Sequence, residues 1–183
     1  MDDRAARTPP AGDLTGCVKA SEQSFDCYRD ELTAIVARHS PQKAFAALKQ
    51  YYDNVSYVKS QCHQLTHAIG RAALDRYGEL SDTYAQGDHY CWAGYHHGAL
   101  EEYSANKGFD YVIKNANQVC EKLASREKFS FNHYNCVHGL GHGFMEVQNG
   151  ELFFALYACD KINDDWERES CYVGVYMQNF MEA

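Results

Sequence analysis

The sequence predicts an all-α fold built from stacked helical hairpins. No long alternation of apolar and polar residues, the pattern of a half-buried strand, occurs in the chain. The only three prolines lie before residue 42, so little interrupts helices beyond that point. Four glycines each follow a stretch whose apolar residues recur at three- and four-residue spacing: Gly78, Gly87, Gly108 and Gly150.

These glycines divide the chain into units that each contain a short helix followed by a long helix. We expect the four units at about 41–78, 79–108, 109–150 and 151–183. Ser40-Pro41 favours a helix start, because serine caps helices and proline is tolerated at the first helical position. Asn149-Gly150 favours a stop. One further helix, over residues 17–38, is expected to cap the stack.

Internal repetition supports the hairpin interpretation. Each long helix is expected to open with a cysteine, as in "CHQLTHAIGRAAL", "CWAGYHHGALEEY", "CVHGLGHGFMEV" and "CYVGVYMQNFME". The last three stretches share Cys-x-x-Gly, and the middle two share Cys-x-x-Gly-x-x-His-Gly. A repeat of about 30–42 residues is typical of stacked helical hairpins. Chance similarity among small residues is the alternative explanation.

The ends of the chain look different from its centre. Residues 16–183 are predicted to form a single all-helical domain. Residues 1–15 are acidic and contain proline, which favours a disordered leader or an end added for expression, without the apolar segment of a signal peptide. The last residues stop within a helical pattern, which favours a piece of a longer chain with further domains.

Composition and missing motifs exclude several classes of function. The net charge of -8 argues against nucleic acid and anionic membrane surfaces as partners. No apolar run of about 18 residues is present to insert this segment into a bilayer. The chain also lacks a Walker loop, a GxGxxG or GxSxG motif, HExxH and CxxCH.

Eight cysteines without a single CxxC pair predict disulfides between neighbouring helices. They indicate an extracytoplasmic protein, periplasmic or secreted, and buried free thiols are the alternative. Cys120–Cys136 and Cys159–Cys171 are predicted to staple two hairpins. The pairing of the other four stays open: Cys17, Cys27, Cys62 and Cys91. A Cys17–Cys27 bridge needs a break in the chain, because ten helical residues span about 15 Å.

The histidines form the main functional signal. His63 and His67 are four residues apart, as are His138 and His142, and such pairs project from one helix face. Aligned on the cysteines, His97 and His142 occupy the same position. Two histidines at this spacing can hold one metal ion from a single helix. The predicted metal ligands are therefore His63, His67, His97, His138 and His142, although histidines hydrogen-bonded in a polar core are the alternative.

Two carboxylates are expected on the same helix faces as these histidines, since Glu101 follows His97 by four residues and Glu146 follows His142 by four. They are candidate ligands, orienting acceptors or general bases. Further groups are expected around the site: His96, Tyr95, Tyr176 and Met177. Met177 is either a soft ligand that favours copper or an ordinary core residue.

The remaining histidines are expected elsewhere. His89 and His133 precede their long helices in the predicted scheme, which makes them rim groups, and His39 is expected on the surface. Gly139 and Gly143 lie on a face beside the histidine stripe, so we expect them to let helices approach closely. Five or more ligands suit either two ions or one open-coordinated ion. Copper, iron and zinc all remain candidates.

The leading functional hypothesis is a His/Glu-ligated metalloenzyme that acts on a small molecule. Redox or oxygen chemistry is favoured slightly over hydrolysis, with Glu101 or Glu146 moving protons. One alternative is a non-catalytic module that binds, stores or senses copper or zinc. The other is a disulfide-stapled extracytoplasmic interaction scaffold whose histidines are structural.

Overall fold

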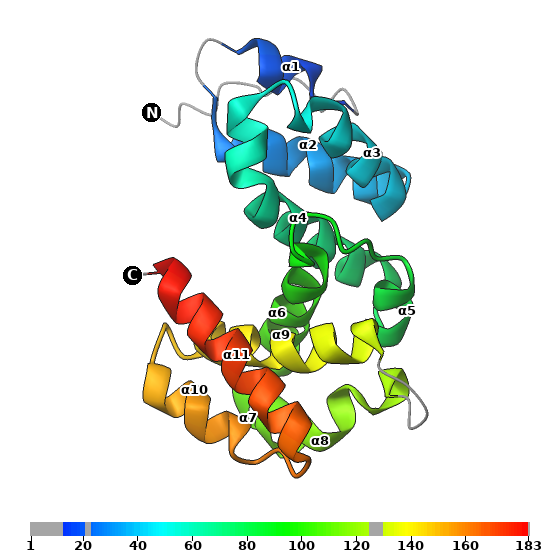
Figure 1. The fold of residues 1–183 in the computed structure, drawn as a ribbon. Coiled ribbons are helices and arrows are strands. Elements are labelled where there is room, and N and C mark those ends of the chain that lie inside the picture. Colours follow the sequence, from blue (N-terminus) through cyan, green and yellow to red (C-terminus); the bar gives the residue numbers. More distant parts are fainter. Residues whose placement is uncertain (1–12, 21–22, 125–129, 183) are drawn as a thin grey trace, which may run out of the picture.

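The prediction of an all-α, disulfide-stapled fold is confirmed. The computed structural model describes residues 13–20, 23–124 and 130–182, and within these ranges every regular element is a helix (Figure 1). The first helices are α1 (Thr15–Lys19), α2 (Phe25–Arg38), α3 (Pro41–Tyr52) and α4 (Ser56–Tyr77). The side chain of Ser40 accepts a hydrogen bond from the Lys43 N–H, and Pro41 begins α3, as the sequence predicts.

The single helix predicted over residues 17–38 is wrong. The chain leaves the helical conformation after Lys19 and starts α2 at Phe25, where Ser24 provides the N-cap. This break allows Cys17 and Cys27 to pair, with their Cα atoms 5.7 Å apart. Leu14, within the expected leader, is buried, and Thr15 begins α1. Residues 1–12 of that leader lie outside the described residues.

The remaining helices alternate in length, but the short segment before α9 is divided. They are α5 (Leu80–Ala85), α6 (Gly94–Lys107), α7 (Phe109–Lys114), α8 (Ala116–Val119), the 3-10 helix η1 (Glu121–Leu123), α9 (Phe131–Val147), α10 (Leu152–Cys159) and α11 (Asp165–Glu182). The cysteines do not open the long helices as expected. Cys62, Cys136 and Cys171 lie in the second turn of theirs, and Cys91 precedes α6. In α9 the start is fixed earlier, by the N-cap of Ser130.

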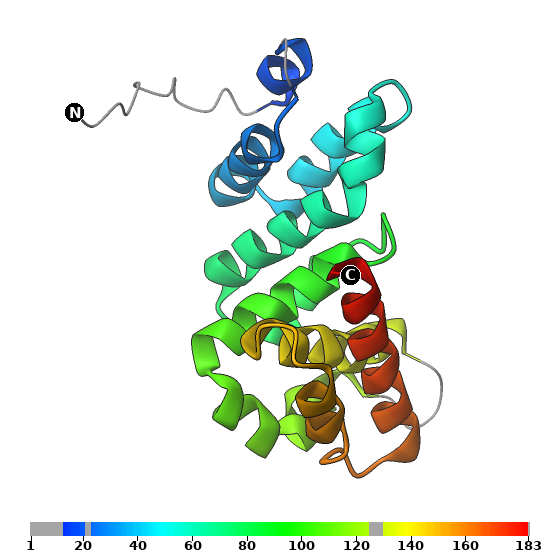
Figure 2. The ribbon, with the colours of Figure 1, turned by 90° about the vertical axis from the view of Figure 1, so that its left-hand side faces the viewer.

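The four long helices pack in series: α4 against α6, α6 against α9, and α9 against α11 (Figures 1 and 2). Glycines form the closest contacts between them. A Cβ atom added to Gly98 of α6 would lie 2.1 Å from the His67 carbonyl oxygen of α4, and one added to Gly174 of α11 would lie 1.9 Å from the His138 carbonyl oxygen of α9. Gly139 and Gly143 face Leu100 and Ser104 of α6. The small residues therefore set the spacing of the stack.

Four disulfides join segments that are close in the fold. Cys120–Cys136 and Cys159–Cys171 are the pairs that the hairpin scheme predicts, and Cys17–Cys27 and Cys62–Cys91 complete the set. One apolar core lies around α2, α3 and α4, and the other lies around α6, α9, α10 and α11. Among the described residues, no helix is both long enough and apolar enough to cross a membrane.

Candidate metal centre

Five buried histidines meet where α4, α6 and α9 pack together. His63 and His67 lie one turn apart on α4, and His138 and His142 lie one turn apart on α9. His97 of α6 lies between the two pairs. None of the five is more than 9% exposed to solvent. Packing of the glycine-bearing helices thus brings all five predicted ligands to one place, although they span 80 residues of sequence.

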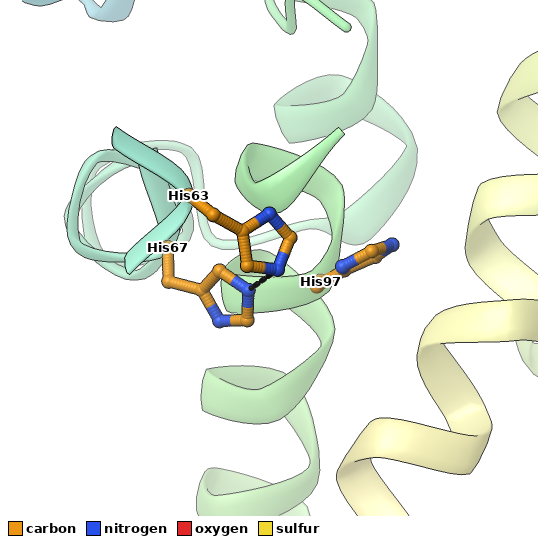
Figure 3. Close-up of side chains that lie close together, drawn as sticks. All are labelled: His63, His67 and His97. Atoms are coloured by element: carbon orange, nitrogen blue, oxygen red, sulfur yellow. Dashed lines mark hydrogen bonds between the residues drawn. The ribbon is translucent and has the colours of Figure 1, made fainter. Parts of the chain in front are cut away.

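The cluster consists of two groups of three histidines that share one member. His63, His67 and His97 form the first triad, and within it the candidate ligand atoms lie within 4.8 Å of one another (Figure 3). The second triad contains His97, His138 and His142 and meets the same limit. Each triad has the number of histidines that holds zinc in many catalytic sites.

The imidazoles of His63 and His67 face each other through their Nε2 atoms, which are 3.0 Å apart. The opposite nitrogens have other partners. His63 Nδ1 donates to the carbonyl oxygen of Cys91 at 2.8 Å, and His67 Nδ1 donates to Glu101 Oε2 at 3.0 Å. Burial and the neighbouring His67 lower the pKa of His63, so the neutral ring is the stable form.

Glu101 is a buried carboxylate that orients His67. Its Oε2 accepts a hydrogen bond from His67 and another from Arg71 Nη2 at 2.7 Å. Burial alone would raise the pKa of Glu101, but His67 and Arg71 outweigh it and lower the pKa to about 2. Glu101 therefore stays ionised at neutral pH.

The second pair resembles the first but is less constrained. His138 Nε2 and His142 Nε2 are 3.2 Å apart, and His142 Nδ1 lies 2.7 Å from Gln178 Oε1 of α11. His138 Nδ1 is buried without a hydrogen-bond partner. Burial, followed by the neighbouring histidines, lowers the pKa of His138 to about 4 and that of His142 to about 3. The same two causes lower the pKa of His97 well below its usual value.

The second predicted carboxylate, Glu146, lies at the edge of the site. Its side chain is exposed, and its Oε1 is 3.8 Å from Arg71 Nη2. Arg71 therefore links Glu146 to the buried Glu101. This placement leaves Glu146 in contact with solvent, unlike the five histidines.

The four groups expected around the site lie in different surroundings. The Tyr95 ring packs against Phe45, and its hydroxyl donates to the Thr83 carbonyl oxygen. Tyr176 is 55% exposed, and Met177 is half-buried on α11. His96 is fully buried against Tyr84, and neither of its ring nitrogens has a hydrogen-bond partner. None of the four belongs to either triad.

The peripheral histidines partly follow expectation. His89 lies in the loop before α6 and stacks on His96, and His39 is exposed. His133 does not precede its helix, because α9 already begins at Phe131. Its Nε2 instead pairs with Glu167 Oε1 of α11 at 2.8 Å.

Sequence reasoning missed several residues that support the histidines. Arg71 had a signal, since it continues the His63–His67 stripe by four residues. Gln178 and the Cys91 carbonyl gave none, because their roles depend on which helices become neighbours. Tyr134 also lies against the site, with its ring stacked 5.5 Å from that of His138.

A cleft of about 270 Å³ lies beside the first triad, between α2 and α4. His67 and Arg71 of α4 line one wall, and Phe25 and Arg29 of α2 line the other. The cleft gives solvent or a small molecule a route to the edge of His67.

The fold and the cluster together define an all-α, disulfide-stapled domain with histidine triads that could hold a metal ion. Comparison with known proteins found no matching family model, no matching curated protein and no matching solved structure.

Proposed function

We propose that His63, His67 and His97 bind a transition-metal ion and that the domain is a metalloprotein. One observation carries this proposal: the Nε2 atoms of His63 and His67 face each other at 3.0 Å while both Nδ1 atoms already have acceptors. With both rings neutral, this arrangement lacks the proton that an ordinary hydrogen bond between them would need.

The acceptors fix the protonation of both rings. A carbonyl oxygen and an ionised carboxylate can only accept, so His63 Nδ1 and His67 Nδ1 each carry the hydrogen. A neutral imidazole has one N–H, which leaves a bare lone pair on each Nε2. Two lone pairs at this distance repel each other unless a cation lies between them. Burial lowers the pKa of His63, so protonating that ring is unfavourable, and a metal ion shared by both lone pairs is the better cation.

The distances also suit a metal ion. With metal–nitrogen bonds of about 2.05 Å, two nitrogens 3.0 Å apart subtend an angle of about 94° at the ion. His97 completes a three-histidine set from the neighbouring helix. Glu101 orients His67 in the manner of the carboxylates that commonly support metal-bound histidines.

The donor set favours metals that prefer imidazole. Zinc, copper and iron all do so, whereas magnesium and calcium prefer oxygen. All eight cysteines form disulfides, so thiolate ligands are not available to the ion. The four disulfides also support an extracytoplasmic location, because such bonds persist in oxidising compartments.

Three protein ligands leave a coordination position for water, dioxygen or a small substrate. This open position supports a metalloenzyme, and a cleft lined in part by His67 lies beside the triad. The Tyr134 ring stacked on His138 is a candidate redox group near the cluster, and we therefore propose redox or oxygen chemistry ahead of hydrolysis. Glu101 acts as an orienting group, because a pKa of about 2 is too low for an efficient base near neutral pH. Glu146, at the solvent edge, is the better candidate for moving protons.

The burial of all five histidines supports a second candidate function, a non-catalytic module that stores or senses a metal ion. Azide distinguishes the two functions, since it binds an open coordination position and changes the absorption spectrum of the cobalt- or copper-loaded protein. An enzyme-type site should respond to millimolar azide. A closed storage site should give the same spectrum with and without it.

Elemental analysis of protein purified without a histidine tag tests metal binding itself. We expect stoichiometric zinc, copper or iron in the unmodified protein and loss of the first-site ion in a His63→Ala/His67→Ala variant. His39→Ala is the matched control, because this exposed histidine lies outside the cluster. Absence of metal, together with unfolding that a chelator leaves unchanged, would contradict the proposal and favour structural histidines in an interaction scaffold.

A further inference from the structure

The geometry points to a second metal ion at His97, His138 and His142, with the imidazole of His97 bridging the two ions. This inference rests on the proposed metal-binding function and adds to it the number of ions and the residue that couples them. The bridge would couple the unpaired electrons of the two ions.

His97 is placed between two histidine pairs that do not share a helix with it. Its ring centroid lies 5.5 Å from that of His63 and 5.6 Å from that of His67, both on α4. On the other side it lies 4.9 Å from His138 and 4.3 Å from His142, both on α9. In Figure 3 one ring nitrogen of His97 lies on the side of His63, and the other points toward α9.

The Nδ1 atom of His97 has no hydrogen-bond partner that would explain its position. The side chain is 2% exposed, and its Nδ1 is buried without a hydrogen-bond partner. A buried polar atom without a partner costs stability, so such an atom in a native fold calls for an explanation. An ion on each side would give both nitrogens of the ring a partner.

The second triad can form a site of its own. His138 Nε2 and His142 Nε2 are 3.2 Å apart, which corresponds to an angle of about 103° at an ion with metal–nitrogen bonds of about 2.05 Å. Gln178 holds the opposite nitrogen of His142 through Oε1. Both rings thus project one nitrogen toward the same point beside His97.

The two sites should fill in order. In the first pair both Nδ1 atoms face acceptors and the two Nε2 atoms face each other, so neutral rings place two lone pairs where a cation is favoured. In the second pair His138 Nδ1 has no partner, so His138 can carry its hydrogen on Nε2 and donate it to His142. An ion at the second site must displace that proton. Binding of the second ion also releases the remaining N–H proton of His97 to solvent, and the resulting imidazolate offsets one positive charge of the ion pair.

Copper titration followed by electron paramagnetic resonance tests the bridge. Metal-free, tag-free protein should bind one Cu(II) with a full one-copper signal. A second Cu(II) should then remove most of the signal, because an imidazolate bridge couples the two unpaired spins. Protein that receives one Zn(II) before one Cu(II) should give an isolated copper signal. His138→Ala/His142→Ala should bind one ion and keep its signal, and His39→Ala should behave like the unmodified protein.

Three other outcomes are distinguishable, and each contradicts a different part of the proposal. A limit of one ion in the unmodified protein removes the second site and leaves the proposed function intact. Two ions with a signal that integrates to two independent coppers removes the bridge. No bound ion removes both the inference and the proposed function. The Cu/Zn comparison uses only unmodified protein, so the test stands even where the His138→Ala/His142→Ala substitution prevents folding.

Discussion

Replacing Gly98 by alanine should destabilise the fold through one identifiable contact. The added Cβ would lie 2.1 Å from the His67 carbonyl oxygen, whereas ordinary Cβ contacts begin at 3.4 Å. The difference, 3.4 − 2.1 = 1.3 Å, must come from moving helix α6 away from α4, since the obstacle is backbone. Overpacking of this kind costs about 3 kcal/mol, and alanine returns about 1 kcal/mol of helix propensity. We therefore expect a net loss of about 2 kcal/mol.

Gly139→Ala is the matched control in the neighbouring long helix. Its Cβ would lie 3.1 Å from Leu100 Cδ2, the end of a flexible side chain that can shift by a few tenths of an ångström. Here the gain in helix propensity should offset the cost, so stability should change by less than about 0.5 kcal/mol.

Urea unfolding followed by circular dichroism, with the disulfides intact and a chelator present, measures both variants. The m-value should stay the same, so that the shift in midpoint reports stability alone. A Gly98→Ala variant as stable as the unmodified protein, or a Gly139→Ala variant that loses as much stability as Gly98→Ala, would refute a steric role of Gly98. Because Gly98 follows His97, Gly98→Ala should also weaken metal binding.

Three further predictions follow from the site and its supports. The metal-free protein should lose stability as the pH falls from 6.5 toward 3. Histidine in the unfolded chain has a pKa near 6.5, whereas burial lowers the pKa of His96 in the folded protein to about 3. The stability contributed by neutral His96 is therefore fully present above pH 6.5 and is lost as the pH falls. At pH 5 this loss should be about 2 kcal/mol. Equal stability at pH 7 and pH 5, or no benefit from His96→Phe at pH 5, would argue against this. Glu101→Gln should lower metal affinity about 10- to 100-fold by calorimetry, because it weakens the orienting partner of His67, whereas an equal loss for the exposed Glu146→Gln would contradict that role. Removing the Cys62–Cys91 disulfide by a double serine substitution should cost about 3–4 kcal/mol, given its separation of 29 residues, and should weaken metal binding; unchanged zinc affinity would show that the Cys91 carbonyl does not position His63.

The Cys62–Cys91 disulfide adjoins a turn whose backbone is left-handed. Cys91, Trp92 and Ala93 are consecutive non-glycine residues with φ values of 53°, 58° and 59°. Left-handed conformations cost about 1–2 kcal/mol per such residue. The disulfide holds one end of this turn against α4, where the Cys91 carbonyl oxygen orients His63. A strained turn that contacts a candidate ligand agrees with the tendency of functional sites to store backbone strain.

Most of the helices can be predicted from the sequence, because the signals for them are local. Apolar spacing, the Ser40 cap and the glycine stops depend on residues within one or two turns of each other, so the helices could be predicted from short windows. The break between α1 and α2 and the division of the segment before α9 were not predicted, because they depend on disulfide pairing and packing. Helices α4, α9 and α11 begin earlier than predicted, because the prediction places each start at the repeated cysteine, which lies in the second turn.

For the candidate site, too, some features follow from local sequence and others depend on packing. The sequence by itself determined which residues could bind metal, since helical periodicity places His63 with His67 and His138 with His142 whatever the tertiary structure. Only the tertiary structure decided that the two pairs face each other across His97, because that depends on how closely the glycines let three helices approach. It likewise decided that Glu101 pairs with Arg71 and His67, since these contacts join helices far apart in the chain. The sequence determined the candidate ligands, and packing determined the geometry that brings them together.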